Sequence, residues 1–352
     1  MCTIRTLLFA AGVSMMLLSC HKEPDSVESS GTAVLTLGGA CQRTRATGIL
    51  PENESRIHRW AYWMFNRSGR AVKCGVGTGG RLDVSLPTGY YTVVVLANHP
   101  TSGIRALPIS VGTTLDALLN RISDLSDNAE NSFVMKGNAS IIIEEGKLSP
   151  VEVRMERLVS KVGVKKIRVS YDKPALSAKT TTLRGIYLTN LYRESRYGND
   201  YSDSDLEASR SKWYNSMGWH RWDAETVNGA IDALVGDRNL SVNLPVSAPY
   251  AQAHYFYCYP NPSRKEYDMH DVASWSIRST RLVIETQVDG KNYYYQIQLP
   301  PMKRNTPYVA EEVVIRSLGS LDPEDIVPGS LEVTFSTGVQ GWEGSYSIEE
   351  ES

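Results

Sequence analysis

The stretch "TRLVIETQVDGKNYYYQIQLP" (residues 280–300) holds two runs of alternating apolar and polar residues, separated by Asp289 and Gly290. Alternation with a period of two is typical of a β-strand that buries one face. An Asp-Gly pair between two such runs is a strong signal for a tight hairpin turn. The stretch therefore predicts two antiparallel strands joined at Asp289 and Gly290.

The same alternation continues through most of the chain. Leu82, Val84 and Leu86 alternate with polar residues, and the turn "PTG" separates them from "YYTVVVLAN", which predicts a second hairpin. Further short strands, each bounded by turn-forming residues, are predicted at "GIYLTN", "LSVNLP", "HYFYCYP", "EEVVIRSL" and "LEVTFSTG". Many short strands predict an all-β protein built from β-sandwiches.

Apolar residues with helical spacing occupy two segments, residues 113–123 and 224–236. The predicted faces consist of Leu115, Leu118, Leu119 and Ile122 in the first segment, and of Val227, Ile231 and Leu234 in the second. Thr113 or Thr114 is the expected N-cap of the first helix, and Gly236 is the expected end of the second. We therefore expect a few short helices beside the strands.

One run, "VEVRMERLVSKVGVKKIRVSY" (residues 151–171), alternates for about twenty residues and exceeds the length of an ordinary strand. We interpret it as the last strand of one sandwich that leads directly into the first strand of the next. The predicted domains are residues 32–160 and residues 161–352. So short a connection predicts a rigid pair of domains.

The first twenty residues, "MCTIRTLLFAAGVSMMLLSC", have the basic start and apolar centre of a secretory signal. Their end resembles the bacterial lipobox, in which the cysteine, here Cys20, is lipidated and becomes the mature N-terminus. The apolar run is too short to span a bilayer. Residues 21–31 are polar without periodicity and are expected to form a flexible tether. Lipidation at Cys20 predicts attachment to a membrane surface.

A first strand is predicted at residues 32–38, where Ala33, Leu35 and Leu37 alternate with other residues and would face inward. Arg43 and Arg45 follow shortly after it. One interpretation of these arginines is a basic surface loop. The other is a protease site, with cleavage between Arg45 and Ala46 or, as the alternative, after Arg43, that would release the first strand.

The composition excludes several classes of function. A formal charge of −2 over 352 residues gives no electrostatic footprint for nucleic acid. The glycine run "GVGTGG" (residues 75–80) matches a dinucleotide-binding pattern but leads into a strand, where that site needs a helix. No hydrolase or metalloprotease signature is present. Cys41, Cys74 and Cys258 have no zinc or disulfide spacing. We expect no catalytic activity, no cofactor and no metal.

The segment "KWYNSMGWHRW" concentrates three tryptophans, Trp213, Trp219 and Trp222. Exposed tryptophans of this kind could stack on sugar rings or form a contact patch for a partner. Buried, they would pack a loop onto its own sandwich. The sequence leaves both interpretations open.

Several segments together resemble the fimbrillins, the pilins of donor-strand pili called type V, and their lipoprotein relatives. They are "RIHRWAYWMFNRSGR", "LPTGYYTVVVLANHP", "NSFVMKGNASI", "VRMERLVSKVGV", "YPNP", "YYYQIQLPPMKRNTPY", "RSLGSLDPED" and "VQGWEGSYSIEEES", behind the lipobox. They run in the family's order over nearly the whole mature chain. The resemblance implies two tandem transthyretin-like, Greek-key β-sandwich domains.

The resemblance also implies a mode of assembly. Such pilins reach the outer membrane as lipoproteins, and an arginine-specific protease removes the anchor with the first strand. A strand of a neighbouring fimbrial subunit then takes the vacated position and forms a cell-surface fimbrium for adhesion. Here the expected donor is the C-terminal tail, residues 337–352, in which Trp342, Tyr346 and Ile348 alternate on one face. An ordinary last strand of its own domain is the alternative.

Two other roles stay open. An anchor subunit would keep its lipid on Cys20, would not be cleaved, and would hold the base of a fimbrium on the outer membrane. A surface lipoprotein of a different class would bind a host protein or glycan through the tryptophan cluster.

Overall fold

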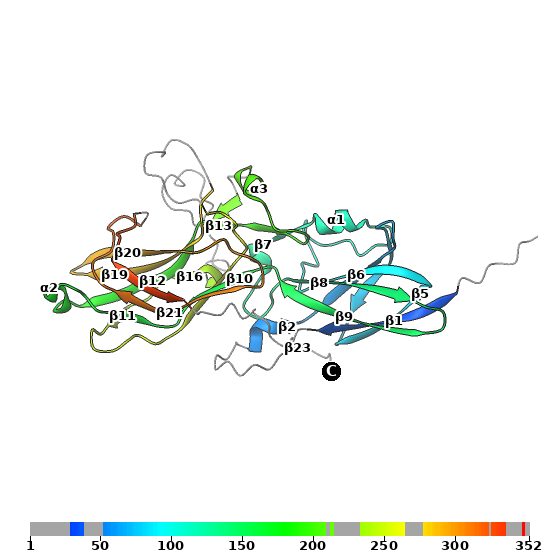
Figure 1. The fold of residues 1–352 in the computed structure, drawn as a ribbon, viewed down its shortest axis with the longest axis horizontal. Helices are drawn as coiled ribbons and strands as arrows, with labels where there is room; N and C mark the ends of the chain where they lie inside the picture. Colours follow the sequence, from blue (N-terminus) through cyan, green and yellow to red (C-terminus); the bar gives the residue numbers. More distant parts are fainter. Residues whose placement is uncertain are drawn as a thin grey trace, which may run out of the picture.

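The structure of the chain is a computed structural model that describes residues 29–38, 52–208, 212–214, 233–264, 277–323, 325–335 and 347–348. The molecule is elongated, with the N-terminal strands at one end and most of the C-terminal strands at the other (Figure 1). No helix among these residues is long and apolar enough to cross a membrane.

Seven strands of the N-terminal half form one sheet in the order β4-β3-β6-β8-β9-β1-β5. The strands of this half are β1 (Ser30–Gly38), β2 (Arg56–Ile57), β3 (Trp60–Phe65), β4 (Ala71–Gly77), β5 (Arg81–Pro87), β6 (Gly89–Ala97), β7 (Ile122–Asp124), β8 (Met135–Ile143) and β9 (Leu148–Arg157). β9 pairs with β8 at residues 155–157 and with β1 at residues 148–154. The sheet therefore folds over along β9, and its two parts enclose a core that includes Trp60, Trp63 and Leu35.

The C-terminal half has two sheets that face each other. One has the order β11-β21-β10-β18 with β22 on β21, and the other has the order β16-β12-β19-β20 with β17 on β12. The strands of this half are β10 (Ser160–Val164), β11 (Ile167–Val169), β12 (Thr181–Thr189), β13 (Leu191–Tyr192), β14 (Glu194–Arg196), β15 (Trp213–Tyr214), β16 (Gly236–Asp237), β17 (Val242–Leu244), β18 (His254–Cys258), β19 (Arg281–Val288), β20 (Lys291–Gln298), β21 (Pro307–Ile315), β22 (Leu331–Phe335) and β23 (Ser347–Ile348). The all-β prediction is confirmed.

The hairpin at residues 280–300 is confirmed. β19 and β20 pair antiparallel from Arg281 with Gln298 to Val288 with Lys291. Asp289 and Gly290 both have positive φ, 50° and 78°, which is the backbone that a two-residue hairpin turn of this kind requires.

The second predicted hairpin is wrong. β5 and β6 follow one another but do not pair: β5 pairs with β1, whereas β6 pairs with β3 and β8. The turn at Pro87, Thr88 and Gly89 passes the chain from one part of the sheet to the other. Alternation identifies a buried face, but it does not identify the strand alongside.

The helices are short. They are α1 (Leu115–Leu119), α2 (Pro174–Ser177), α3 (Asp203–Glu207) and the 3-10 turns η1 (Glu52–Ser55) and η2 (Leu125–Asp127). Thr114 caps α1 and accepts a hydrogen bond from the Ala117 amide, as predicted. Ile122, expected on the helix face, lies instead in β7 and is 38% exposed, because the chain leaves the helix before it. Of the second predicted helix only its end is described, where Leu234 is buried and Gly236 starts β16.

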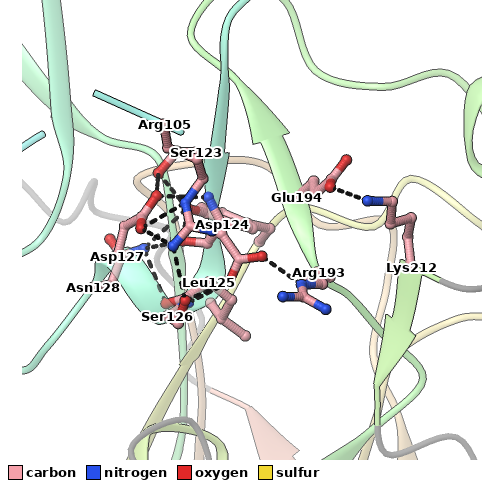
Figure 2. Close-up of polar contacts among 11 residues, drawn as sticks. Arg105, Ser123, Asp124, Leu125, Ser126, Asp127, Asn128, Arg193, Glu194 and Lys212 are labelled. Atoms are coloured by element: carbon pink, nitrogen blue, oxygen red, sulfur yellow. Dashed lines mark hydrogen bonds and ion pairs between the residues drawn. The ribbon is translucent and has the colours of Figure 1, made fainter. Parts of the chain in front are cut away.

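The two halves meet at a polar joint. β14 of the C-terminal half pairs antiparallel with β7 of the N-terminal half. Figure 2 shows Asp124 facing Arg193 across this joint, with Arg105 against Asp127 beside them. The buried Tyr259 hydroxyl lies 2.8 Å from Ser123 Oγ. A hydrophobic core cluster runs continuously through both halves, so the joint is packed as well as hydrogen-bonded.

Asp124 should make this joint sensitive to acid. Burial alone would raise the pKa of Asp124, but hydrogen bonds from Ser126 and Arg193 outweigh it and hold the pKa below its ordinary value. The stabilisation is therefore present above about pH 4 and is lost as the pH falls through the lower folded-state pKa. We expect Asp124→Asn to lower the free energy of unfolding by about 1.5–3 kcal/mol at neutral pH, with the difference vanishing in acid.

Urea denaturation across a pH series measures this difference. Asp83→Asn is the matched control, because Asp83 pairs with Arg81 on the surface with its side chain 49% exposed. A difference between the Asp124 variant and the parent that persists in acid would show that the carboxylate charge is not what stabilises the joint.

Candidate functional site

β1 lies between two other strands, and we call the place that it fills the first-strand position. It runs parallel to β9 on one side and antiparallel to β5 on the other, each over seven residue pairs. Leu35 pairs with Leu82 of β5 and Val151 of β9. Among the described strands, β5 pairs only with β1. Loss of β1 would therefore leave β5 without a partner.

The side chains of β1 contribute to the N-terminal core. Ala33 and Leu35 are fully buried, Val34 is 6% exposed, and Leu37 is half-buried against the core. Alternation places Ala33, Leu35 and Leu37 on the core side of the strand, and the structure covers the opposite side of the strand at Val34 as well. The three residues predicted to face inward thus lie in or against the core.

Gly31 marks the start of the first-strand position. A Cβ atom at this residue would lie 2.2 Å from the Glu144 carbonyl oxygen and 3.0 Å from Ile143 Cγ2. Because the nearest atom belongs to the backbone, no side chain fits at this point without movement of the β8–β9 turn. Any strand that replaces β1 in the same register needs a glycine here or a shift of that turn.

The chain beyond β1 is described again from η1, where Glu54 is buried. Glu54 Oε1 lies 2.6 Å from Lys161 Nζ and accepts a hydrogen bond from the Tyr257 hydroxyl. Arg157 Nε donates to the Glu54 carbonyl at 2.8 Å. Burial lowers the pKa of Lys161, and the neighbouring Glu54 carboxylate opposes that effect. These contacts hold residue 54 between the two halves of the molecule.

Sequence reasoning missed this pair, because Glu54 and Lys161 are 107 residues apart and neither belongs to a recognisable motif. The one available signal was the lysine itself, the single charged residue among the small and apolar residues of β10.

The predicted lipidation and cleavage residues lie outside the described residues. These residues are Cys20, Arg43, Arg45 and Ala46. Trp342 and Tyr346 of the tail also lie outside them. The tail backbone is described at β23, which pairs parallel with β2, joining Ile348 to Ile57. This short strand therefore lies against the N-terminal half of its own chain.

The tryptophan cluster is described at Trp213 alone; Trp219 and Trp222 lie outside the described residues. Trp213 is 4% exposed, packs edge-on against Tyr192 at 5.5 Å between ring centroids, and donates its Nε1 hydrogen to the Leu206 carbonyl. It presents no free ring face to a sugar. The structure favours the packing interpretation for this residue.

Several other glycine, acidic and cysteine residues have structural roles. The glycine run leads from β4 into β5 and forms a strand connection. Asp205 closes a capping box with Ser202 at α3, and Asp200 binds Arg304. Cys258 is fully buried, which raises the pKa of its thiol to about 12. Cys74 and Cys258 are both free, and Cys41 lies outside the described residues.

The fold can be compared with solved structures. A fimbrilin from Porphyromonas gingivalis matches with a TM-score of 0.57 and 14% identity, over 88% of this chain and 97% of that one. The tip fimbrial protein Mfa3 of the same organism matches with a TM-score of 0.50 and 13% identity, over 87% and 98%. A protein from Bacteroides eggerthii assigned to cell adhesion matches with a TM-score of 0.61 and 17% identity, over 88% and 95%.

The chain has the fimbrillin fold. The coverage of both partners in each comparison shows that the fimbrillin fold extends over nearly the whole chain and is not limited to one half. Identities of this size establish the fold alone. The sequence matches no protein-family model and no curated protein.

Proposed function

We propose that the chain is a structural subunit of a surface fimbrium, exported as an outer-membrane lipoprotein and assembled with other fimbrial subunits by donor-strand exchange for cell adhesion. The observation that carries this proposal is the first-strand position. β1 fills part of the N-terminal core and pairs with two strands. It is also the first of the described strands in chain order, and Arg43 and Arg45 follow it. The fimbrillin fold supports the proposal.

Release of β1 would drive assembly through the fold itself. It would leave β5 unpaired, and it would open the core around Ala33 and Leu35 to water. An edge with unpaired backbone groups and an uncovered apolar layer is a strong acceptor for another extended segment. The donor in this proposal is the C-terminal tail of another subunit, which leaves its own β2 to enter the first-strand position.

Cleavage at Arg45 is the step that an experiment can isolate. The lipidated protein, incubated with an arginine-specific protease, is expected to yield a new N-terminus at Ala46 and a ladder of polymers on denaturing gels. Arg43→Ala combined with Arg45→Ala should abolish both, because no arginine then lies between β1 and η1. Arg67→Ala, which removes an exposed arginine from the β3–β4 turn, is the matched control and should behave as the parent.

Three outcomes separate the roles. Unchanged processing and polymer in the double arginine variant would contradict the proposal. A parent chain that keeps an acylated Cys20 and forms no polymer would support the anchor role instead. Deletion of residues 341–352 should leave a processed, folded monomer without polymer, and polymer from that variant would exclude the tail as donor.

A further inference from the structure

A polar cavity of about 120 Å³ lies beside the joint between the two halves. β8 contributes Lys136 and Asn138 to its wall, β9 contributes Arg154 and Glu156, and the loop between β20 and β21 contributes Arg304. Its volume is several times the roughly 10–15 Å³ that a cavity needs to hold one water molecule. A space of this size and polarity suits one small charged group and not an apolar ligand.

Arg304 is held rigidly at the wall of this cavity. Its Nε donates to Asp200 Oδ1 at 2.7 Å, and its Nη1 donates to the Gly198 carbonyl at 2.9 Å. Its Nη2 contacts Asp200 and, at 3.4 Å, the Arg196 carbonyl. These contacts use four of the five N–H groups of a guanidinium. One Nη1 hydrogen is left for a further acceptor, in a side chain that is 14% exposed.

Lys136 is a half-buried cation that makes no hydrogen bond or ion pair within the described residues. It lies directly opposite Glu156 in the β8–β9 pairing, yet the two form no ion pair within 4 Å. Burial lowers the pKa of Lys136 and the positive charge of Arg304 lowers it further, while the negative charges of Glu156 and Asp200 oppose this only in part. A charged group in such a place is costly unless something compensates it. Arg154, at the exposed side of the cavity, also has no ion-pair partner among the described residues.

The charges around the cavity do not balance. Lys136, Arg154 and Arg304 bring three positive charges, whereas Glu156 and the Asp200 that binds Arg304 bring two negative charges. The excess is positive, so a metal ion or an ammonium group would be repelled. An oxyanion would accept from Lys136 and from the last Nη1 hydrogen of Arg304, because hydrogen bonds between ionised partners are the strong ones.

We infer that this cavity is an oxyanion-binding site that takes a carboxylate or sulfate group, with Lys136 and Arg304 as the principal donors and Arg154 at the entrance. The cavity adjoins the first-strand position, because Arg154 of β9 pairs with Gly38 of β1, but its two principal donors, Lys136 of β8 and Arg304, lie outside β1, β5 and β9. Such groups occur as free ions and as substituents of sugars on extracellular glycans, and the probes below distinguish the two sources.

The test is isothermal titration calorimetry of the monomeric, uncleaved chain. Three anionic probes are used: inorganic sulfate, N-acetylneuraminic acid and N-acetylglucosamine 6-sulfate. Ionic strength is kept constant with potassium chloride, because general screening would otherwise imitate binding. N-acetylglucosamine is the neutral control. We expect saturable binding of at least one anion and none of the neutral sugar. Tighter binding of the sugar anions than of sulfate would identify a glycan as the source, and equal binding would identify a free-anion site.

Lys136→Gln should weaken anion binding by about tenfold or more, since it removes a desolvated charge from the contact. Arg154→Gln should weaken binding less. Because Arg154 is exposed, this substitution should leave folding unchanged. Lys291→Gln, which removes an equal charge from an exposed residue of β20, should leave binding unchanged. The inference is overturned if no probe binds saturably to the parent. It is also overturned if both Lys136→Gln and Arg154→Gln, folded by circular dichroism, bind as the parent does.

Discussion

A chain that begins at Ala46, and so lacks β1, is expected to melt on the order of 10 °C or more below a chain that begins at Ser29. The reason is the burial of β1. Two or three apolar side chains at about 1.5–3 kcal/mol each contribute roughly 3–9 kcal/mol, against a total stability of about 5–15 kcal/mol for a protein of ordinary size. Loss of the β5 pairing adds to this. Calorimetry of the two chains measures the difference.

A peptide of residues 30–38 should restore the lost stability when added to the shortened chain. The same peptide with Leu35→Asp should fail, because Leu35 is fully buried and an unpaired carboxylate there is strongly unfavourable. Thr32→Asp is the matched control, since successive residues of a strand face opposite sides and Thr32, which is partly exposed, lies on the side away from Leu35. An unchanged melting temperature after loss of β1 would contradict the structural role of the first strand. Equal rescue by all three peptides would contradict its register.

Lys161→Met is expected to lower the free energy of unfolding by about 3–5 kcal/mol, because it leaves the Glu54 carboxylate buried without its ammonium partner. The side chains of Lys161 and Glu54 are 3% and 2% exposed. Replacing both, with Glu54→Leu in the second position, should recover much of the loss, since a buried ion pair is often no better than apolar residues of similar volume. Urea denaturation of the two variants measures both effects.

Lys165 gives this experiment its control. Lys165 Nζ lies 2.7 Å from Glu311 Oε1, nearly the same distance as in the buried pair, but the two side chains are 36% and 40% exposed. Lys165→Met should therefore cost only about 0–1 kcal/mol. If Lys161→Met cost no more than Lys165→Met, the position of residue 54 would have to be fixed by packing and backbone hydrogen bonds alone.

The sequence predicted the parts of this fold that depend on local chemistry. The turn at Asp289 and Gly290 was found because positive φ at two successive residues restricts the residue types that fit. Thr114 was found because an N-cap needs a side-chain oxygen. The turn at residues 87–89 misled, because Pro and Gly mark only a change of direction. Which strand then lies alongside is decided by layers that form far away in the chain.

The candidate site was predictable to the same extent. Alternation identified β1 and its inward residues, but neither β9 nor β5 could be identified as its neighbours, because pairing over long separations leaves no local pattern. The cavity around Lys136 likewise joins two consecutive strands, β8 and β9, to Arg304 in a distant loop. Charged residues on strands and in loops usually face water, so nothing in the sequence distinguished Lys136 or Arg304 from ordinary surface residues.

The direction of β1 has a mechanical consequence. β1 begins at the outer end of the N-terminal half and runs toward the C-terminal half (Figure 1). An outward pull on its first residue, Ser30, would therefore act along the strand axis, against the hydrogen bonds to β9 and β5 on both sides. These bonds must be sheared together, whereas a pull across the strand would break them one at a time. The pairing of β1 therefore resists a force along its axis, and a donor strand in the same direction and register would inherit that strength.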